Sequence, residues 1–240
     1  MSRLLAVLVL VLAPLRSFCD VVVFEDSFAG SVFDTSKWDI KLPFSDSAVT
    51  QSGGKANLFA RGTIVSKASF TDPYMLTGSF VNLNNTAHSA YSVFVISLRT
   101  SGAYTGDPYG GIDGLVVSMW ARTAAPGGGD GLYFGISNGT NFLTRYWYPT
   151  TGQEHFFSIS DNGASVSLDI DGVRMFDYAT SLSWGNKIGF ASRETLGGPG
   201  GSDYTGDVDL MGVQVSVPEP SSLSLLLAGG LVALAGRRKA

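Results

Sequence analysis

The stretch Asp161-Asn-Gly-Ala-Ser-Val-Ser-Leu-Asp-Ile-Asp-Gly-Val173 predicts a β-strand between two hairpin turns. Its apolar residues Val166, Leu168 and Ile170 alternate with Ser and Asp, and this period of two places alternate side chains on opposite faces of a strand. The Asn-Gly pair before the strand and the Asp-Gly pair after it favour tight turns, because these residues tolerate a positive φ. The stretch therefore indicates a half-buried strand in an antiparallel sheet.

The same alternation recurs from residue 20 to residue 217, and no window of ten residues shows a helical period. Only the segment 34–38 predicts a short helical turn. The last strand is expected over 211–217. Further strands are expected at 21–25, 55–60, 63–70, 75–83, 91–100, 114–123, 131–137, 142–148, 155–161, 173–178 and 187–192.

A dozen or so short strands, without an internal repeat or a linker, predict an all-β, antiparallel β-sandwich or jelly roll over residues 20–216. The chain has 240 residues, 45% hydrophobic and 15% charged, which excludes a disordered protein. A single Cys excludes a disulfide framework and a Cys-based zinc site. The body is thus expected to be one domain.

The charge of the chain argues against a nucleic-acid partner. The formal net charge is −4, and residues 20–217 hold 11 Lys or Arg against 19 Asp or Glu, a net charge of −8. Phosphate backbones require clustered cations, which this body lacks. Its acidity suits solubility or calcium.

The sequence predicts a targeting segment at each end of the chain. Arg3 followed by the apolar run Leu4–Leu12 predicts a secretory signal peptide over residues 1–19, with cleavage before Asp20. At the other end, Val217-Pro-Glu-Pro220 predicts an extended spacer, because neither Pro continues a helix or a central strand. A short apolar helix is expected over residues 221–236, and the cations that follow it favour the cytoplasmic side of a membrane.

The C-terminal segment 217–240 resembles the PEP-CTERM sorting signal. The matching residues are Pro218, Glu219, Pro220, Arg237, Arg238 and Lys239. The resemblance implies export of a Gram-negative protein by the secretion translocon, with transient anchoring at the periplasmic face of the inner membrane through the C-terminal helix. An exosortase would then remove the tail and leave the protein at the cell surface or in an extracellular matrix rich in exopolysaccharide.

The body resembles concanavalin A-like lectin and glucanase domains. The motifs that carry this resemblance are Phe24–Phe28 and Phe33–Trp38 at the opening of the body, and Ile188–Phe190 near its end. The segment 156–178 looks like a hairpin of laminin-G type domains. The resemblance implies a jelly-roll sandwich of this class.

The glucanase branch of that superfamily carries its catalytic acids in an E-x-D-x-x-E pattern. The nearest match here is 111–116, in which Asp113 stands between Gly111 and Val116, so both glutamates are missing. No other paired-Glu motif, nucleophile elbow or metalloprotease motif occurs in the chain. The body is therefore expected to be non-enzymatic, although the pattern leaves open a pair of Asp on separate strands.

Two kinds of binding residue remain. Trp120, Tyr109, Tyr146 and Tyr148 are candidates for stacking on sugar rings, with packing inside the sandwich as the alternative. His155 is expected to be a strand-edge residue rather than a base or a metal ligand. Calcium is a candidate cofactor, with ligands drawn from the acidic loop residues Asp107, Asp113, Asp203 and Asp207, for which the alternative is solvation.

These patterns together favour a secreted, exosortase-processed matrix protein that binds carbohydrate. A structural or adhesive module without sugar binding is one alternative, and a divergent glycoside hydrolase using Asp is another.

Overall fold

A computed structural model describes residues 20–43, 45, 47–83, 92–104, 112–121, 131–145, 147, 152–193 and 207–219. Seven of these residues, Trp120 and Asp207 among them, are described by their main chain only. The chain divides into two units: one holds Val22–Ser216, and the other holds the two terminal segments. The fold of the first unit positions every candidate site considered below.

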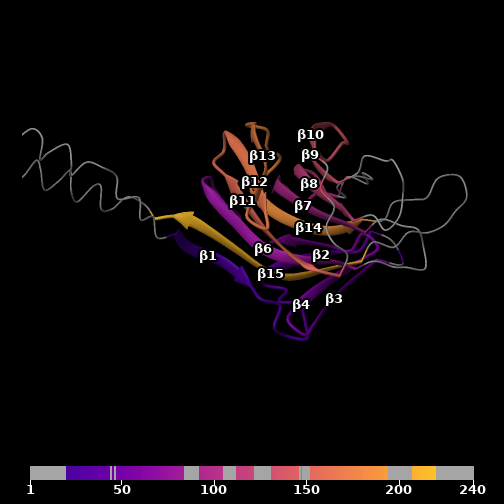
Figure 1. Ribbon diagram of the computed structural model, residues 1–240. Helices are drawn as coiled ribbons and strands as arrows, with labels where there is room; N and C mark the ends of the chain where they lie inside the picture. Colours follow the sequence, from indigo (N-terminus) through magenta and orange to yellow (C-terminus); the bar gives the residue numbers. More distant parts are fainter. Residues whose placement is uncertain are drawn as a thin grey trace, which may run out of the picture. The chain divides into compact units, whose positions relative to one another are not determined.

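All regular elements among the described residues are strands, and they form two antiparallel sheets (Figure 1). Sheet A has the order β13-β12-β11-β6-β15-β4-β3, with β1 also paired to β15, and sheet B has the order β10-β9-β8-β7-β14-β5-β2. The strands are β1 (Asp20–Asp26), β2 (Trp38–Lys41), β3 (Ala48–Ser52), β4 (Lys55–Phe59), β5 (Thr63–Ser66), β6 (Tyr74–Leu83), β7 (Ser92–Thr100), β8 (Leu115–Ala121), β9 (Leu132–Ile136), β10 (Asn141–Arg145), β11 (Glu154–Asp161), β12 (Ser165–Ile170), β13 (Val173–Ala179), β14 (Lys187–Arg193) and β15 (Asp207–Pro218).

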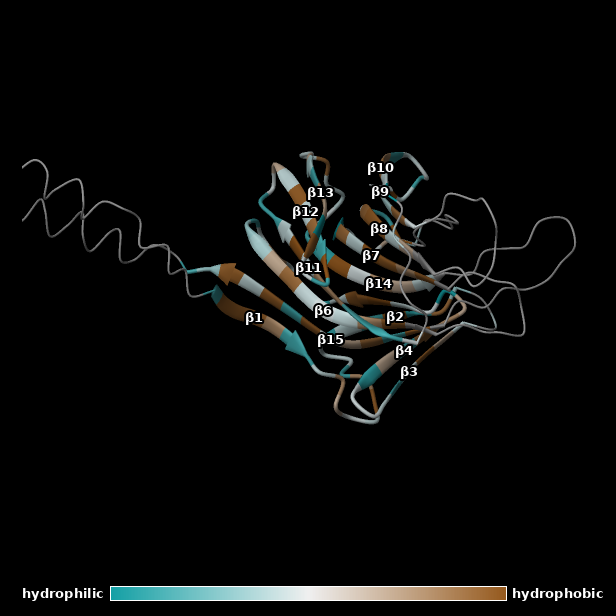
Figure 2. Ribbon diagram, viewed as in Figure 1, coloured by the Kyte–Doolittle hydropathy of each residue, from teal (hydrophilic) through white to brown (hydrophobic). Residues whose placement is uncertain are grey.

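Aromatic rings fill the space between the two sheets. Phe80 of sheet A stacks on Phe94 of sheet B with ring centroids 4.6 Å apart, and Phe94 lies parallel to Phe190 at 6.1 Å. At the other end of the sandwich, Phe134 stacks on Phe176 at 4.5 Å. The strands in Figure 2 are banded brown and pale or teal, as expected for strands with one face in a core.

The prediction for the stretch around residue 165 is confirmed. β12 pairs with β11 on one side and with β13 on the other, and its burial alternates residue by residue. Asp171 and Gly172, in the second turn, have φ of 51° and 75°. This left-handed conformation is tolerated by Asp and Gly, so the Asp-Gly signal identified the turn correctly.

Two strands were missed by the sequence prediction. β2 was not expected, although the short turn before it was, and there the amides of Lys37 and Trp38 donate to the carbonyl of Asp34. β3 was also missed, because its sequence Ala-Val-Thr-Gln-Ser has little apolar alternation. The expected strand over residues 63–70 ends earlier, at Ser66 in β5.

A buried ion pair joins the two sheets at one end. The guanidinium of Arg99, from β7, donates to both carboxylate oxygens of Asp161, from β11, at 2.9 and 2.6 Å. The Tyr74 hydroxyl donates to the same carboxylate at 3.1 Å. Burial and the neighbouring Asp161 raise the pKa of Tyr74 well above its ordinary value, and the hydrogen bond to Asp161 raises the pKa of Arg99. The cluster therefore stays charged on Arg99 and neutral on Tyr74.

The sequence-predicted targeting segments lie almost wholly outside the described residues. Outside the described residues lie the predicted signal peptide, residues 1–19, and the predicted apolar helix, residues 221–236. Of the sorting motif, Pro218 ends β15 and Glu219 follows it. Within the described ranges, no helix is long and apolar enough to cross a membrane.

Candidate functional site

The two sheets differ in what their outer faces carry. In sheet B, Phe94 and Phe190 point into the sandwich, so Val95 of β7 and Ala191 of β14 point to the outer face. With Val93 and Val116 they form a buried apolar cluster, against which Tyr133 packs. The three central strands β7, β8 and β14 present no carboxylate on this face among the described side chains.

The segment between β7 and β8 supplies Ile112 to this face. A Cβ built on Gly189 would lie 2.3 Å from Cδ1 of Ile112, so Ile112 occupies the space over the glycine of β14. Ile112 itself is fully buried. A hydrophobic side chain therefore fills the part of the outer face where an open cleft would need room for a ligand.

Asp113 holds this segment in place. Its carboxylate accepts hydrogen bonds from the hydroxyls of Thr100 and Ser101, both at 2.5 Å, and from the amides of Ser101 and Gly102 at 3.0 and 3.2 Å. The residue is 8% exposed. From the sequence, Asp113 is a candidate calcium ligand, and in the structure its carboxylate is already engaged by four donors that close a loop.

The other predicted calcium ligands are placed only in part. Asp107 and Asp203 lie outside the described residues, and Asp207 is described by its main chain, at the start of β15. Their neighbour Asp209 is buried and accepts hydrogen bonds from the Lys55 ammonium and, at 3.0 Å, from the Asn57 amide. Within the described ranges, no three acidic, His or Cys side chains gather in a metal-binding group.

The predicted sugar-stacking residues are likewise placed only in part. Tyr109, Tyr146 and Tyr148 lie outside the described residues, and Trp120 is described by its main chain in β8. Trp147 is described, and its ring packs edge-on against Phe80 and His155, with centroids 6.5 and 5.3 Å apart. This places Trp147 against the core side of the sandwich.

His155 has a structural partner. Its Nδ1 lies 2.8 Å from an oxygen of Asp171, in the turn between β12 and β13, and its ring packs on Phe80. The imidazole lies at the beginning of β11, where the sequence placed it, and it is buried on the core side of that strand. The contact fastens the β12–β13 hairpin to β11.

The outer face of sheet A is open by contrast. Phe157 points into the core, so its neighbour Phe156 points outward, and Phe156 is 60% exposed. Beside it across the sheet lie Ser79 of β6 and then Gly212 of β15. Because Ser has a short side chain and Gly has none, the sheet surface next to the Phe156 ring is hollow.

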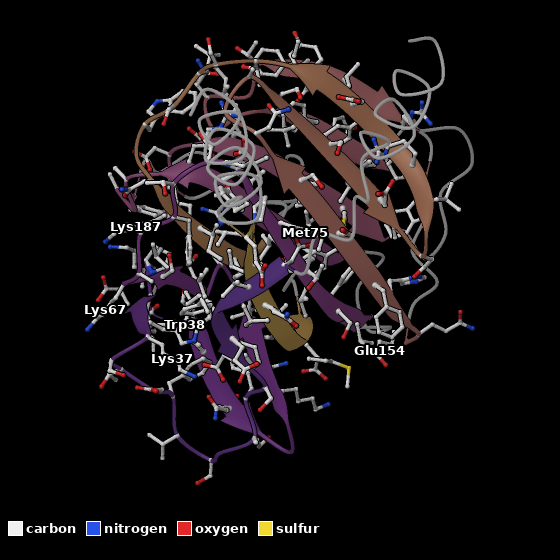
Figure 3. All side chains as sticks on the ribbon, turned by 90° about the vertical axis from the view of Figure 1, so that its left-hand side faces the viewer. Lys37, Trp38, Lys67, Met75, Glu154 and Lys187 are labelled. Atoms are coloured by element: carbon white, nitrogen blue, oxygen red, sulfur yellow. The ribbon has the colours of Figure 1, made fainter. Side chains whose placement is uncertain are left out.

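This hollow, here called the Phe156 groove, has a volume of about 490 Å³. This volume lies within the range of small-molecule pockets, about 300–1,000 Å³, and fits a sugar unit or a short oligosaccharide. The groove is lined by Glu25, Asp26, Ser27, Lys37, Thr77, Gly78, Ser79, Phe156, Met211, Gly212, Val213 and Gln214. In Figure 3, Lys37 and Glu154 lie on opposite sides of the yellow strand β15.

Polar groups surround the exposed ring. The next row of the sheet brings Ser158, Thr77 and Gln214 side by side on the same face. The Ser79 hydroxyl donates to Glu154 at 2.5 Å, and the Lys37 ammonium donates to the main-chain carbonyl of Glu25 at 2.8 Å. An apolar ring flanked by hydroxyl, amide and carboxylate groups is the arrangement that stacks on the C–H face of a sugar and hydrogen-bonds its hydroxyls.

Phe156 was not among the binding residues expected from the sequence. The signal was present in the pair Phe156-Phe157, because two adjacent residues of a strand point to opposite faces and only one can enter the core. The sequence alone left the choice between them open.

Comparison with known proteins identifies the tail and the fold. A family model described as the PEP-CTERM protein-sorting motif matches residues 216–239. The chain therefore carries the sorting motif of an exported protein, and the motif implies exosortase as its processing partner. A search of curated protein sequences gives no significant match.

Solved structures match the body at low sequence identity. A β-glucanase from Bacillus licheniformis has a TM-score of 0.56 at 12% identity, covering 81% of this chain and 97% of that one. A β-agarase A in complex with oligoagarose has a TM-score of 0.59 at 12% identity, covering 84% and 94%. A GlcNAcα1-4Gal-releasing endo-β-galactosidase from Clostridium perfringens has a TM-score of 0.57 at 10% identity, covering 86% and 64%.

These likenesses establish the fold class. The body is a concanavalin A-like jelly roll of the kind found in glycanases, as the sequence predicted. The chain thus carries a PEP-CTERM sorting motif at its C-terminal end and a β-sandwich body whose fold is like that of these glycanases.

Proposed function

We propose that this protein is processed by an exosortase and binds carbohydrate in the extracellular matrix through the Phe156 groove, without cleaving it. The observation that carries the proposal is the exposed Phe156 ring beside a hollow lined by polar groups. The glycanase-like fold supports carbohydrate as the ligand class, since the three solved relatives are glycan-degrading enzymes by name.

The absence of cleavage rests on the outer face of sheet B. Retaining glycoside hydrolysis needs two carboxyl groups about 5–5.5 Å apart on either side of the scissile bond. The sequence lacks the paired glutamates, Asp113 is engaged by four hydrogen-bond donors, and Val116 lies in the apolar cluster. The described part of this face therefore holds no pair of free carboxyl groups of the kind that retaining hydrolysis uses.

Affinity electrophoresis in gels that contain neutral polysaccharides tests the binding. The wild-type protein is expected to be retarded by at least one glycan, and Phe156→Ala is expected to bind roughly tenfold or more weakly, because burying a Phe ring contributes about 1.5–3 kcal/mol. The matched control is Val173→Ala, which removes an equally exposed apolar side chain from β13 and should leave binding unchanged.

A reducing-end assay on the same glycans separates binding from hydrolysis. The proposal expects retardation without release of new reducing ends. Release that disappears in Asp113→Asn would establish a divergent hydrolase instead, whereas no retardation by any glycan would favour a structural or adhesive module.

Mass spectrometry of the exported protein tests the processing. We expect a mature N-terminus at Asp20 and loss of the tail close to Pro218 and Glu219. An intact tail on the exported protein would contradict processing by an exosortase.

A further inference from the structure

A second recess lies away from the Phe156 groove, and the two share no lining residue. It has a volume of about 290 Å³ and sits where β6 begins, β7 ends and the segment 180–186 passes between them. Its principal lining residues are Phe70, Asp72, Tyr74, Arg99, Ser183 and Asn186. It is here called the Asp72 recess.

The charged groups behind this recess are already paired. Arg99 donates to Asp161 through Nε and Nη2, and its Nη1 donates to the carbonyls of Thr180 and Leu182 at 3.1 and 3.0 Å. Tyr74 also donates to Asp161. The guanidinium therefore already donates to four oxygen atoms, and both carboxylate oxygens of Asp161 already accept hydrogen bonds.

Asp72 is the group left over. Within the described part of the chain its carboxylate has no hydrogen bond and no ion pair, and it lies on the surface. Burial raises the pKa of Asp72, and the nearby Asp161 charge raises it further, while Arg99 opposes the shift. The exposed carboxylate thus lies at the recess without a donor from the described residues, and it can accept hydrogen bonds from a ligand that replaces water there.

The remaining lining defines the chemistry that would supply the donor. Phe70 and Tyr74 form an apolar floor, with ring centroids 6.1 Å apart. Ser183 and Asn186 are exposed at the border. The Ser183 hydroxyl donates to the carbonyl of Gly185 at 2.8 Å and can still accept a hydrogen bond, and the Asn186 side chain offers an amide. A negative carboxylate disfavours acidic ligands, whereas a sugar ring presents hydroxyl donors to the carboxylate and C–H groups to the floor.

We propose that the Asp72 recess is a second carbohydrate site, which takes a single uncharged sugar residue, so that one body bridges two glycan chains. The ligand class rests on the proposed function of the Phe156 groove, but the recess is a separate site. A protein held in a polysaccharide matrix through one site meets the neighbouring glycan segments at a raised effective concentration through its second site, which suits cross-linking of the matrix.

Binding stoichiometry tests the second site. Isothermal titration of the exported protein with a short oligosaccharide of the neutral glycan that retards it is expected to give two sites per chain. Asp72→Asn should weaken one of these sites by about tenfold or more, because it removes a charged acceptor, and leave the other unchanged. Asp177→Asn, at an exposed carboxylate of β13, is the matched control. Asn186→Ala is a second variant of the recess and should affect the same site.

Bridging supplies an independent readout. Beads coated with the glycan should aggregate with the wild-type protein, but not with Asp72→Asn or Phe156→Ala, each of which retains one site. One site per chain with unchanged binding by Asp72→Asn would overturn the second site and leave the proposed function standing. Absence of binding to every glycan would overturn both.

Discussion

The outer faces of the two sheets have opposite characters, although both are built from alternating strands. On sheet B the outward positions of the central strands hold Val93, Val95 and Val116, and Ile112 fills the space over Gly189. On sheet A the outward positions hold Ser79, Phe156 and Gln214, which remain open to solvent or line a hollow. A fold shared with glycanases therefore does not decide which face meets a ligand, since the outward side chains close one face here and leave the other open.

The difference between the two faces requires that the two sheets stay packed together. Asp161→Ala removes the ion pair between Arg99 of sheet B and Asp161 of sheet A. The substitution leaves the buried Arg99 guanidinium without its partner, and we expect a loss of about 3–5 kcal/mol in the free energy of unfolding, measured by chemical denaturation. Arg99→Ala should cost a similar amount, and the double variant less than the sum. A loss below about 1 kcal/mol would show that the pair contributes little.

The closed state of sheet B depends next on Asp113. Asp113→Ala removes the acceptor of four hydrogen bonds and leaves buried donors unpaired, so we expect a loss of roughly 2–3 kcal/mol in denaturation experiments. Asp113→Asn retains the shape of the side chain and should cost less. Equal stability of the alanine variant and the wild type would contradict the role assigned to this carboxylate.

A matched pair of alanine variants compares the faces directly. Val95→Ala, on sheet B, removes methyl groups from a side chain that is 1% exposed, and we expect a loss of about 2 kcal/mol in stability with no change in glycan binding. Phe156→Ala, on sheet A, should change stability by less than about 0.5 kcal/mol and weaken binding. Weaker glycan binding by Val95→Ala, together with unchanged binding by Phe156→Ala, would place the ligand on sheet B instead.

The smallest expected effect concerns Asp72. Burial and the Asp161 charge raise the pKa of Asp72 in the folded protein. A carboxyl whose pKa is higher folded than unfolded favours folding most at low pH, and that contribution is lost as the pH rises through the folded pKa. Asp72→Asn should therefore stabilise the protein at neutral pH, by roughly a few tenths of a kcal/mol because solvent screens this exposed group. Denaturation at several pH values should show the gain disappearing in acid.

Local signals predicted the fold well, and long-range pairing explains what they missed. Apolar alternation and Asp-Gly turns are patterns of a few adjacent residues. They therefore predict the hairpins of β11, β12 and β13 from the sequence alone. β2 has only four residues, and its strand character comes from pairing with β5, more than twenty residues away. A strand that is held mainly by a partner far along the chain need not show apolar alternation in its own sequence.

The candidate site was harder to predict for the same reason. Whether a strand residue points inward or outward depends on what the opposite sheet places against it, so the sequence did not separate Phe156 from Phe157. Asp113 was recognised as unusual, but its donors lie 11 to 13 residues away at the end of β7 and just beyond it. The Phe156 groove arises from Ser79 and Gly212 on strands far apart in the chain.

Glycan binding to the outer face of sheet A is tested most directly by an NMR map of the side chains that a bound neutral glycan perturbs. We predict that the perturbed signals gather at Thr77, Phe156 and Gln214 on the outer face of sheet A, while those of Val95 and Val116 on sheet B stay unchanged. Perturbations centred on Val95 and Val116 would place the ligand on sheet B and contradict binding at the Phe156 groove.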